Sequence, residues 1–343
     1  MSAGKTQTRP QTFPATAWKR ADPTWFRNAK WGVFTHYLAD IASSQTQPGI
    51  TVEAWNRRVD SFDVSRYIEQ LKSVRAKYNF LTLGQNSGYY CSPNLTYDEL
   101  VGERPSRLSR RDLVADLAEA CDSAGIRQMV YFTSSAPANH PIAIERLGCT
   151  PKDERVARKM GLHPEKYRVQ PDVDARLTRF QRNWEAVIRE GSLRWGRKVH
   201  GWWIDGGYAA DDLYRHEDEP NFRSFASAMK AGNPDSLVAF NPGVRSPVIC
   251  HTPYEDFTAG ELNEPCVRHL GPAISGAQYH VLIYLGEFWG NGGPRFSRDL
   301  AVAYSRYVVD HGGVITWDVP ITPEGSLLPE YLDLLGEIGR AVG

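Results

Sequence analysis

The chain has 343 residues, 41% hydrophobic and 23% charged, which suits a globular protein with a large buried core. Lys plus Arg and Asp plus Glu each number 40, so the chain lacks the basic excess that favours binding to nucleic acid. No cysteine cluster has zinc-site spacing, and no apolar run approaches the ~20 residues that span a bilayer. We therefore expect no metal, no other cofactor, no nucleic-acid partner and no membrane span, while the oligomeric state stays open.

The first 24 residues are polar and contain prolines, and we expect them to form an arm ahead of the fold. The opening stretch "MSAGKTQTRPQT" lacks the apolar core of a signal peptide. The five cysteines are odd in number, which favours a reducing compartment. These features predict a cytoplasmic location, unless a signal has been removed.

Eight short apolar runs, rich in β-branched and aromatic residues, predict strands beyond the arm. They cover residues 31–37, 79–84, 127–133, 199–205, 236–242, 256–261, 280–286 and 312–319. The sixth run, "DFTAGE", has the weakest strand pattern. Most of the runs are apolar throughout rather than alternating, as expected for parallel strands that are buried on both faces.

Segments with helical periodicity fill several gaps between these strands. They cover residues 63–78, 110–125, 176–196, 221–233, 297–313 and 328–343, and no comparable helix follows the fifth or sixth strand. This alternation predicts an α/β fold: a somewhat irregular (β/α)8 TIM-like barrel in a single domain over residues 25–343. A doubly wound open sheet is the alternative, although no GxGxxG or P-loop follows any strand, which disfavours a nucleotide-binding version.

Polar and aromatic side chains gather where the predicted strands end, which is where barrels of this kind place their active sites. Such residues can bind a polyhydroxylated ligand, but turns also favour Asp, Asn and Gly at strand ends. The candidates for substrate binding are His36, Tyr37, Gln85, Asn86, Tyr89, Tyr90, Trp203, Asn241, Glu264, Glu287, Trp289 and Trp317.

Two carboxylates suggest catalysis. Asp205 ends the fourth strand in "GWWIDGG", where two glycines leave room beside it, and Glu261 follows Gly260 in a similar way. Two carboxylates on neighbouring strand ends among aromatic residues meet the needs of glycoside hydrolysis, in which one attacks the anomeric carbon or positions water and the other protonates the leaving oxygen. A metal site built from His36, Asp205 and Glu261 is the alternative, since neither GxSxG nor HExxH is present.

Five segments, in order, resemble the α-L-fucosidases of glycoside hydrolase family 29. They are "WFRNAKWGVFTHY" (25–37), "FDVSRYIEQLKSVRAKYNFLTLG" (62–84), "SRRDLVADLAEACDSAGIRQMVYF" (109–132), "GWWIDG" (201–206) and "GGVITWDVPITPEGSL" (312–327). The resemblance covers most of the chain from about residue 24 and implies the catalytic barrel of that family. The C-terminal β-sandwich that the family often adds is not expected, because the chain ends after the last predicted helix.

The resemblance also implies roles for particular residues in a retaining exo-glycoside hydrolase. Asp205 matches the family's nucleophile, and Glu261 is the expected acid/base, with Glu264 and Glu287 as alternatives. His36 matches a histidine that hydrogen-bonds sugar hydroxyls, and Trp289 matches an aromatic residue that lines the pocket.

The second strand departs from the family pattern. Family members commonly carry a His-His pair there, whereas this chain has Gln85 and Asn86 in "GQNSGYY". Amides can bond hydroxyls, but a site built around particular hydroxyls discriminates sharply through such contacts, so the sugar need not be fucose. Two alternatives stay open: a carbohydrate-binding barrel that has lost catalysis, and another sugar-active enzyme such as a lyase or a metal-assisted isomerase.

Overall fold

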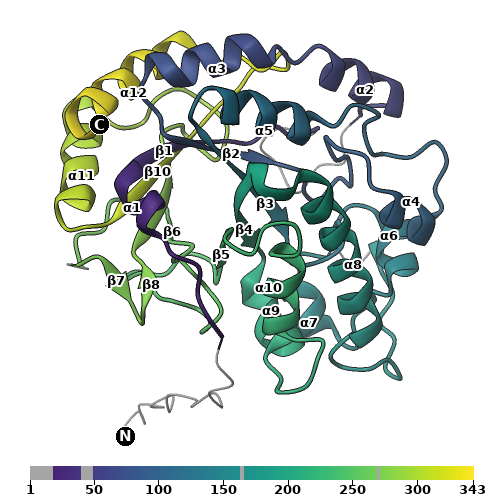
Figure 1. Cartoon of the computed structure of the whole chain (residues 1–343). Helices are drawn as coiled ribbons and strands as arrows, with labels where there is room; N and C mark the ends of the chain where they lie inside the picture. Colours follow the sequence, from purple (N-terminus) through teal and green to yellow (C-terminus); the bar gives the residue numbers. More distant parts are fainter. Residues whose placement is uncertain (1–17, 40–48, 163–165, 269–270) are drawn as a thin grey trace, which may run out of the picture.

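A computed structural model describes residues 18–39, 49–162, 166–268 and 271–343, so most of the predicted arm lies outside the described residues. Eight parallel strands form one curled sheet in the order β5-β4-β3-β2-β1-β10-β9-β6 (Figure 1). The strands are β1 (Trp31–Thr35), β2 (Tyr78–Thr82), β3 (Arg127–Thr133), β4 (Val199–Asp205), β5 (Leu237–Phe240), β6 (Glu261–Leu262), β9 (His280–Tyr284) and β10 (Val314–Val319). Because β1 pairs with β10, the sheet curls back on itself as in a TIM-like barrel, and a flat doubly wound sheet is excluded.

Helices surround the curled sheet (Figure 1). The predicted helices are present as α3 (Val64–Ser73), α5 (Leu113–Ser123), α8 (Thr178–Trp195), α10 (Phe222–Met229), α11 (Arg298–Asp310) and α12 (Pro329–Val342). Shorter helices that sequence periodicity did not predict are α1 (Thr24–Ala29), α2 (Val52–Asp60), α4 (Leu95–Val101), α6 (Pro141–Leu147), α7 (Glu154–Lys159) and α9 (Gly207–Tyr214). A hairpin of β7 (Ala273–Ile274) and β8 (Ala277–Gln278) lies between β6 and β9.

Aromatic rings fill the interior of the barrel. Phe34 lies beside Phe80 in register, with ring centroids 5.6 Å apart, and Tyr131 stacks on Trp203 at 5.4 Å. Phe26 of α1 packs against the ring of Tyr78 at the opposite end of the barrel from the strands' C-termini. Burial of each such ring contributes about 1.5–3 kcal/mol. The packed interior leaves the C-terminal ends of the strands as the place for a pocket.

The gap between β5 and β6 is closed by side chains as well as by backbone. The Asp256 carboxylate accepts a hydrogen bond from the Val238 backbone N–H at 2.9 Å and forms an ion pair with the buried Lys230 at 2.6 Å. The Asp256 backbone N–H donates to the Val238 carbonyl at 2.8 Å. This side-chain pairing, together with a positive φ of 64° at Gly260, interrupts a regular ladder. The predicted strand over 256–261 is therefore wrong in extent, and regular pairing is confined to Glu261–Leu262.

Glu255, in the same closing segment, makes the stability of the fold depend on pH. Its fully buried carboxyl group accepts hydrogen bonds from the backbone of Phe240 at 3.1 Å and Thr252 at 2.5 Å, and burial raises its pKa to about 7. A raised folded-state pKa contributes stability that is present below about pH 4.5 and is lost as the pH rises through about 7.

We expect the free energy of unfolding of the parent chain to fall by roughly 3 kcal/mol more than that of Glu255→Gln between pH 4.5 and pH 8, because the amide cannot ionise. Urea unfolding at the two pH values measures this difference. Glu185 and Glu261 also have raised pKa values but are present in both proteins, so their contributions cancel. Equal pH dependence of the two proteins would show that the pKa of Glu255 is the same in the folded and the unfolded state.

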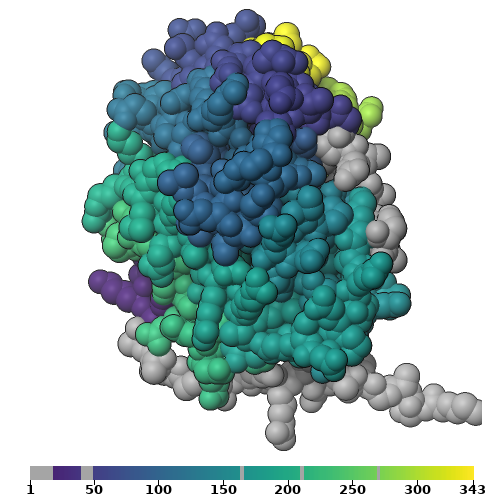
Figure 2. Space-filling model, turned by 90° about the vertical axis from the view of Figure 1, so that its right-hand side faces the viewer, coloured from purple at the N-terminus to yellow at the C-terminus, as the bar shows by residue number. Residues whose placement is uncertain are grey.

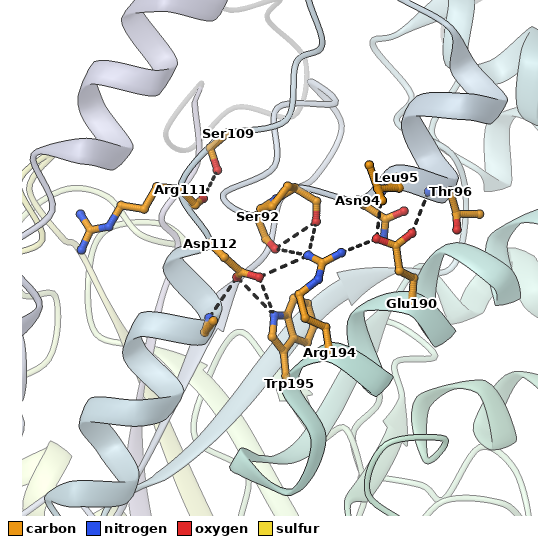
Figure 3. Close-up of polar contacts among 12 residues, drawn as sticks. Ser92, Asn94, Leu95, Thr96, Ser109, Arg111, Asp112, Glu190, Arg194 and Trp195 are labelled. Carbon is orange, nitrogen blue, oxygen red and sulfur yellow. Dashed lines mark hydrogen bonds and ion pairs between the residues drawn. The ribbon is translucent and has the colours of Figure 1, made fainter.

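A polar cluster joins three helices outside the sheet (Figure 3). Glu190 of α8 accepts a hydrogen bond from the Thr96 backbone N–H at 2.7 Å, in the first turn of α4. Arg194, one turn further along α8, contacts both Glu190 and Asp112, and Trp195 donates to Asp112 at 3.1 Å. Asp112 precedes α5 as its N-terminal cap. The cluster therefore holds α4, α5 and α8 together. The part of the chain that contains these helices, in blue and teal, covers much of the face in Figure 2.

Candidate active site

One amide bridges two carboxylates at the C-terminal end of the barrel. Asp205 ends β4, Asn241 follows β5, and Glu261 begins β6. The Asn241 Nδ2 group donates to Asp205 Oδ1 at 2.9 Å and to Glu261 Oε2 at 2.5 Å. Because both bonds share one nitrogen, the two carboxylate oxygens cannot lie farther apart than the sum of these distances. The barrel thus brings together two acidic groups that are 56 positions apart in the numbering of the sequence.

Further hydrogen bonds orient the Asp205 carboxylate. The Tyr131 hydroxyl donates to Asp205 Oδ2 at 2.7 Å, and the Gly206 backbone N–H donates to Oδ1 at 2.8 Å. The Tyr131 hydroxyl in turn accepts from the Gln85 amide at 2.6 Å. Burial, together with the negative charge of Asp205, raises the pKa of Tyr131 well above its usual range, so this phenol stays protonated as a donor at neutral pH.

Glu261 differs from Asp205 in its electrostatics. Burial of its carboxyl group, reinforced by the charge of Asp205, raises the pKa of Glu261 to about 7. The hydrogen bond from Asn241 and the proximity of His36 oppose this rise. A carboxyl group with such a pKa holds its proton up to neutral pH and can donate it to a substrate.

His36 is fixed by a fully buried carboxylate. Its Nδ1 atom lies 2.7 Å from Asp318 Oδ1, and Asp318 Oδ2 accepts the Gly290 backbone N–H at 2.6 Å. The His36 ring packs between the rings of Tyr131 and Trp289, with both centroids at 5.9 Å. Asp318 therefore sets the orientation of the imidazole at the pocket wall.

These residues surround a pocket of about 130 Å³. Its wall combines aromatic faces with hydrogen-bonding groups, as small-molecule sites do. The lining residues are Phe34, His36, Leu38, Gln85, Tyr131, Trp203, Asp205, Glu261, Leu282, Phe288 and Trp289. The structure therefore brings the predicted His36, Gln85, Trp203, Asp205, Glu261 and Trp289 to one pocket, and Asn241 lies against its two carboxylates.

Several other candidates lie outside this pocket. Tyr37, Tyr90 and Trp317 are buried in the hydrophobic core, where the Tyr37 hydroxyl donates to the Arg58 carbonyl and the Trp317 indole to Ser305. The Tyr89 hydroxyl donates to the Ile50 carbonyl.

Glu264 is 72% exposed and pairs with Arg295, and Glu287 is also exposed. Asn86 lines a different pocket, which shares Asp205 with the first. None of these side chains lines the first pocket.

Tyr131 is the main residue of the site that the sequence interpretation missed. It lies two positions before the end of β3, whereas most of the candidates predicted from the sequence lie at or just after strand ends. Its register partner across the strands is Trp203, two positions before Asp205. A search for hydrogen-bonding side chains one inward position below the strand ends could have identified it.

Two features are absent from residues 18–39, 49–162, 166–268 and 271–343. In those four ranges, no group of three His, Cys, Asp or Glu side chains is placed to hold a metal ion. Nor is any helix there long and apolar enough to cross a membrane.

Comparison with known proteins identifies the fold. No family model matches the chain, and no curated protein does. An endo-fucoidan hydrolase of glycoside hydrolase family 107 superposes with a TM-score of 0.69 at 17% identity, over 92% of this chain and 53% of that one. An α-L-fucosidase isoenzyme from Paenibacillus thiaminolyticus gives 0.64 at 18% identity, over 93% of this chain and 74% of that one.

A further α-L-fucosidase, a fucosyltransferase mutant, gives a TM-score of 0.65 at 16% identity and is matched over 96% of its length. This chain therefore spans about half of the fucoidan hydrolase but nearly all of this fucosidase. The TM-scores show a shared fold, and the low identities do not single out family 29. The chain has the barrel fold of the fucosidase-like glycoside hydrolases.

Proposed function

We propose that this protein is a retaining exo-glycoside hydrolase similar to α-L-fucosidases, with Asp205 as nucleophile and Glu261 as acid/base. The observation that carries the proposal is the pair of carboxylates bridged by Asn241 in one pocket. Retaining enzymes hold their two carboxyl groups about 5–5.5 Å apart, and the shared amide nitrogen is compatible with that spacing.

The chemistry would proceed in two displacements. Asp205 attacks the anomeric carbon while Glu261 gives its proton to the leaving oxygen, which forms a glycosyl ester on Asp205 and frees the aglycone. Glu261, now ionised, takes a proton from a water molecule, whose oxygen attacks the same carbon and releases Asp205. The raised pKa of Glu261 supports its role as the initial acid.

The remaining pocket residues would bind the sugar. His36 and Gln85 offer hydrogen bonds to hydroxyls, and Trp203 and Trp289 offer apolar faces to the ring. Gln85 also donates to the Tyr131 hydroxyl, so sugar recognition and the position of the nucleophile share a hydrogen-bond chain. The identity of the sugar would follow from this set, and fucose is one candidate.

A screen of aryl glycosides, with NMR analysis of the products, tests this function. We expect release of one sugar with retained anomeric configuration. Binding of glycans without release across the panel would favour a carbohydrate-binding barrel instead. An unsaturated product would indicate a lyase, and activity that requires an added divalent ion would indicate metal-assisted chemistry.

The hydrogen bond from Tyr131 to Asp205 yields a separate prediction. We expect Tyr131→Phe to lower kcat by about 10- to 100-fold, because a hydrogen bond to a charged group contributes about 1.5–3 kcal/mol. Steady-state kinetics on an aryl glycoside measures this loss.

Tyr78→Phe is the matched control, since the Tyr78 hydroxyl bonds Thr316 at 2.7 Å at the opposite end of the barrel. This control should lower thermal stability but leave kcat within about twofold of the parent value. Equal losses of kcat in the two variants would attribute the effect to barrel packing and not to the nucleophile.

A further inference from the structure

A second pocket adjoins the first at Asp205. It has a volume of about 300 Å³, larger than the carboxylate pocket, and its lining includes Asp205, Gly206 and Tyr208. Its lining also includes Arg158 and Lys159, at the C-terminal end of α7. Because the pockets share Asp205, a ligand group in the second pocket would lie next to a sugar in the first.

The segment that supplies Arg158 and Lys159 to this pocket is more basic than the whole chain. The segment 151–170 contains six Lys or Arg residues against three Asp or Glu, whereas the complete sequence is neutral. Lys159 is partly neutralised, because its ammonium group lies 2.5 Å from Asp212, which also pairs with Arg155 at 3.3 Å. Arg158 is exposed and lines this pocket, and it ion-pairs with no acidic side chain among those that the structure describes, which leave out residues 163–165 and 209–211.

Neutral donors and acceptors complete the wall. Asn86 and Thr133 lie in the same pocket, and the half-exposed ring of Tyr208 forms part of its rim. A guanidinium presents a planar fork of N–H donors that matches the oxygens of a carboxylate or a sulfate. Together these side chains provide a charged anchor for an anion and hydrogen bonds for a sugar.

We infer that the second pocket is a subsite for an acidic part of the substrate, a neighbouring sugar unit or substituent that carries a carboxylate or a sulfate, and that Arg158 selects for it. The inference rests on the proposed function in one respect: the sugar whose glycosidic bond is cleaved binds in the first pocket. It adds a substrate class: glycosides with a negative charge next to the reacting sugar.

Binding measurements in an Asp205→Asn background test this inference without interference from turnover. The probes are a sulfated fuco-oligosaccharide and its desulfated form, and an oligogalacturonate and its carboxyl-reduced form. We expect one acidic probe to bind at least about tenfold more tightly than its neutral partner, and Arg158→Gln to remove that preference while leaving the affinity for the neutral probe within about twofold.

The pair of probes that shows this preference tells whether the pocket binds sulfate or carboxylate. Raising the salt concentration from 0.05 to about 0.5 M should shrink the preference, because exposed charges are screened.

Arg155→Gln is the matched control, because Arg155 lies on the same helix and is 60% exposed but does not line the pocket. It should leave the preference intact. The inference is overturned if neither acidic probe is preferred, or if Arg155→Gln and Arg158→Gln have the same effect. Selective binding through Arg158 in a protein that hydrolyses no glycoside would contradict the proposed function and leave the subsite standing. Hydrolysis of a glycoside without a preference for either acidic probe would support the proposed function and overturn the subsite.

Discussion

Replacing Asp205 by alanine should lower kcat by about 10⁴-fold or more, because the variant cannot form the glycosyl ester and loses the first of the two displacements. The fold should survive, since the Asp205 side chain is half-buried at the pocket wall. Its partners keep other hydrogen bonds, Tyr131 to Gln85 and Asn241 to Glu261. Steady-state kinetics and circular dichroism on the same preparation measure both expectations.

Chemical rescue sharpens this test. Azide can enter the space that the Asp205 carboxylate leaves and attack the anomeric carbon of an aryl glycoside, which yields a glycosyl azide with inverted configuration. We expect azide to restore release of the phenol in Asp205→Ala but to have no such effect on the parent. Substantial turnover of Asp205→Ala without azide would remove Asp205 from the nucleophile role.

Glu261→Gln should show the second large effect, and its size should depend on the leaving group. We expect a fall in kcat/KM of about 10²- to 10⁴-fold for substrates with poor leaving groups, because the amide has no proton to give. Aryl glycosides with activated phenols should lose much less in the first displacement. Rates across a series of phenol leaving groups measure this dependence.

The pH profile supplies an independent readout for Glu261. A raised pKa of about 7 means that the group is protonated below that pH and loses its proton above it. The activity of the parent should therefore fall as the pH rises through about 7, and this alkaline limb should be absent in Glu261→Gln.

Glu264→Gln and Glu287→Gln are matched controls, since both side chains are exposed outside the pocket. If either of these shows the leaving-group dependence and Glu261→Gln does not, the acid/base assignment moves to that residue.

Much of the barrel could be predicted from periodicity, because buried parallel strands and amphipathic helices leave strong patterns in a sequence. β3 and β4 were predicted to the residue. The closing segment could not be, since Asp256 satisfies the Val238 N–H with its side chain in place of a ladder, and this depends on the distant Lys230. Short helices such as α7 were missed because six residues carry little periodicity.

The candidate site was predictable where function coincides with a strand end, as for Asp205 and His36. The site was not predictable where the direction of a side chain decides whether it reaches the pocket. Gln85 and Tyr90 both lie in "GQNSGYY", yet the chain turns the Tyr90 ring into the core and Gln85 toward Tyr131. The second pocket depends on α7, which lies between β3 and β4 and approaches Asp205 only in the folded chain.

Trapping the glycosyl-enzyme tests most directly whether Asp205 is the nucleophile. A 2-deoxy-2-fluoro glycoside with an activated leaving group slows the second displacement, so the sugar should accumulate on the enzyme, and peptide mapping by mass spectrometry locates it. We expect one sugar per chain, attached to Asp205 within "GWWIDGG", and no labelling of Asp205→Ala. A sugar ester on another carboxylate, or turnover with inverted configuration and no labelled peptide, would contradict it.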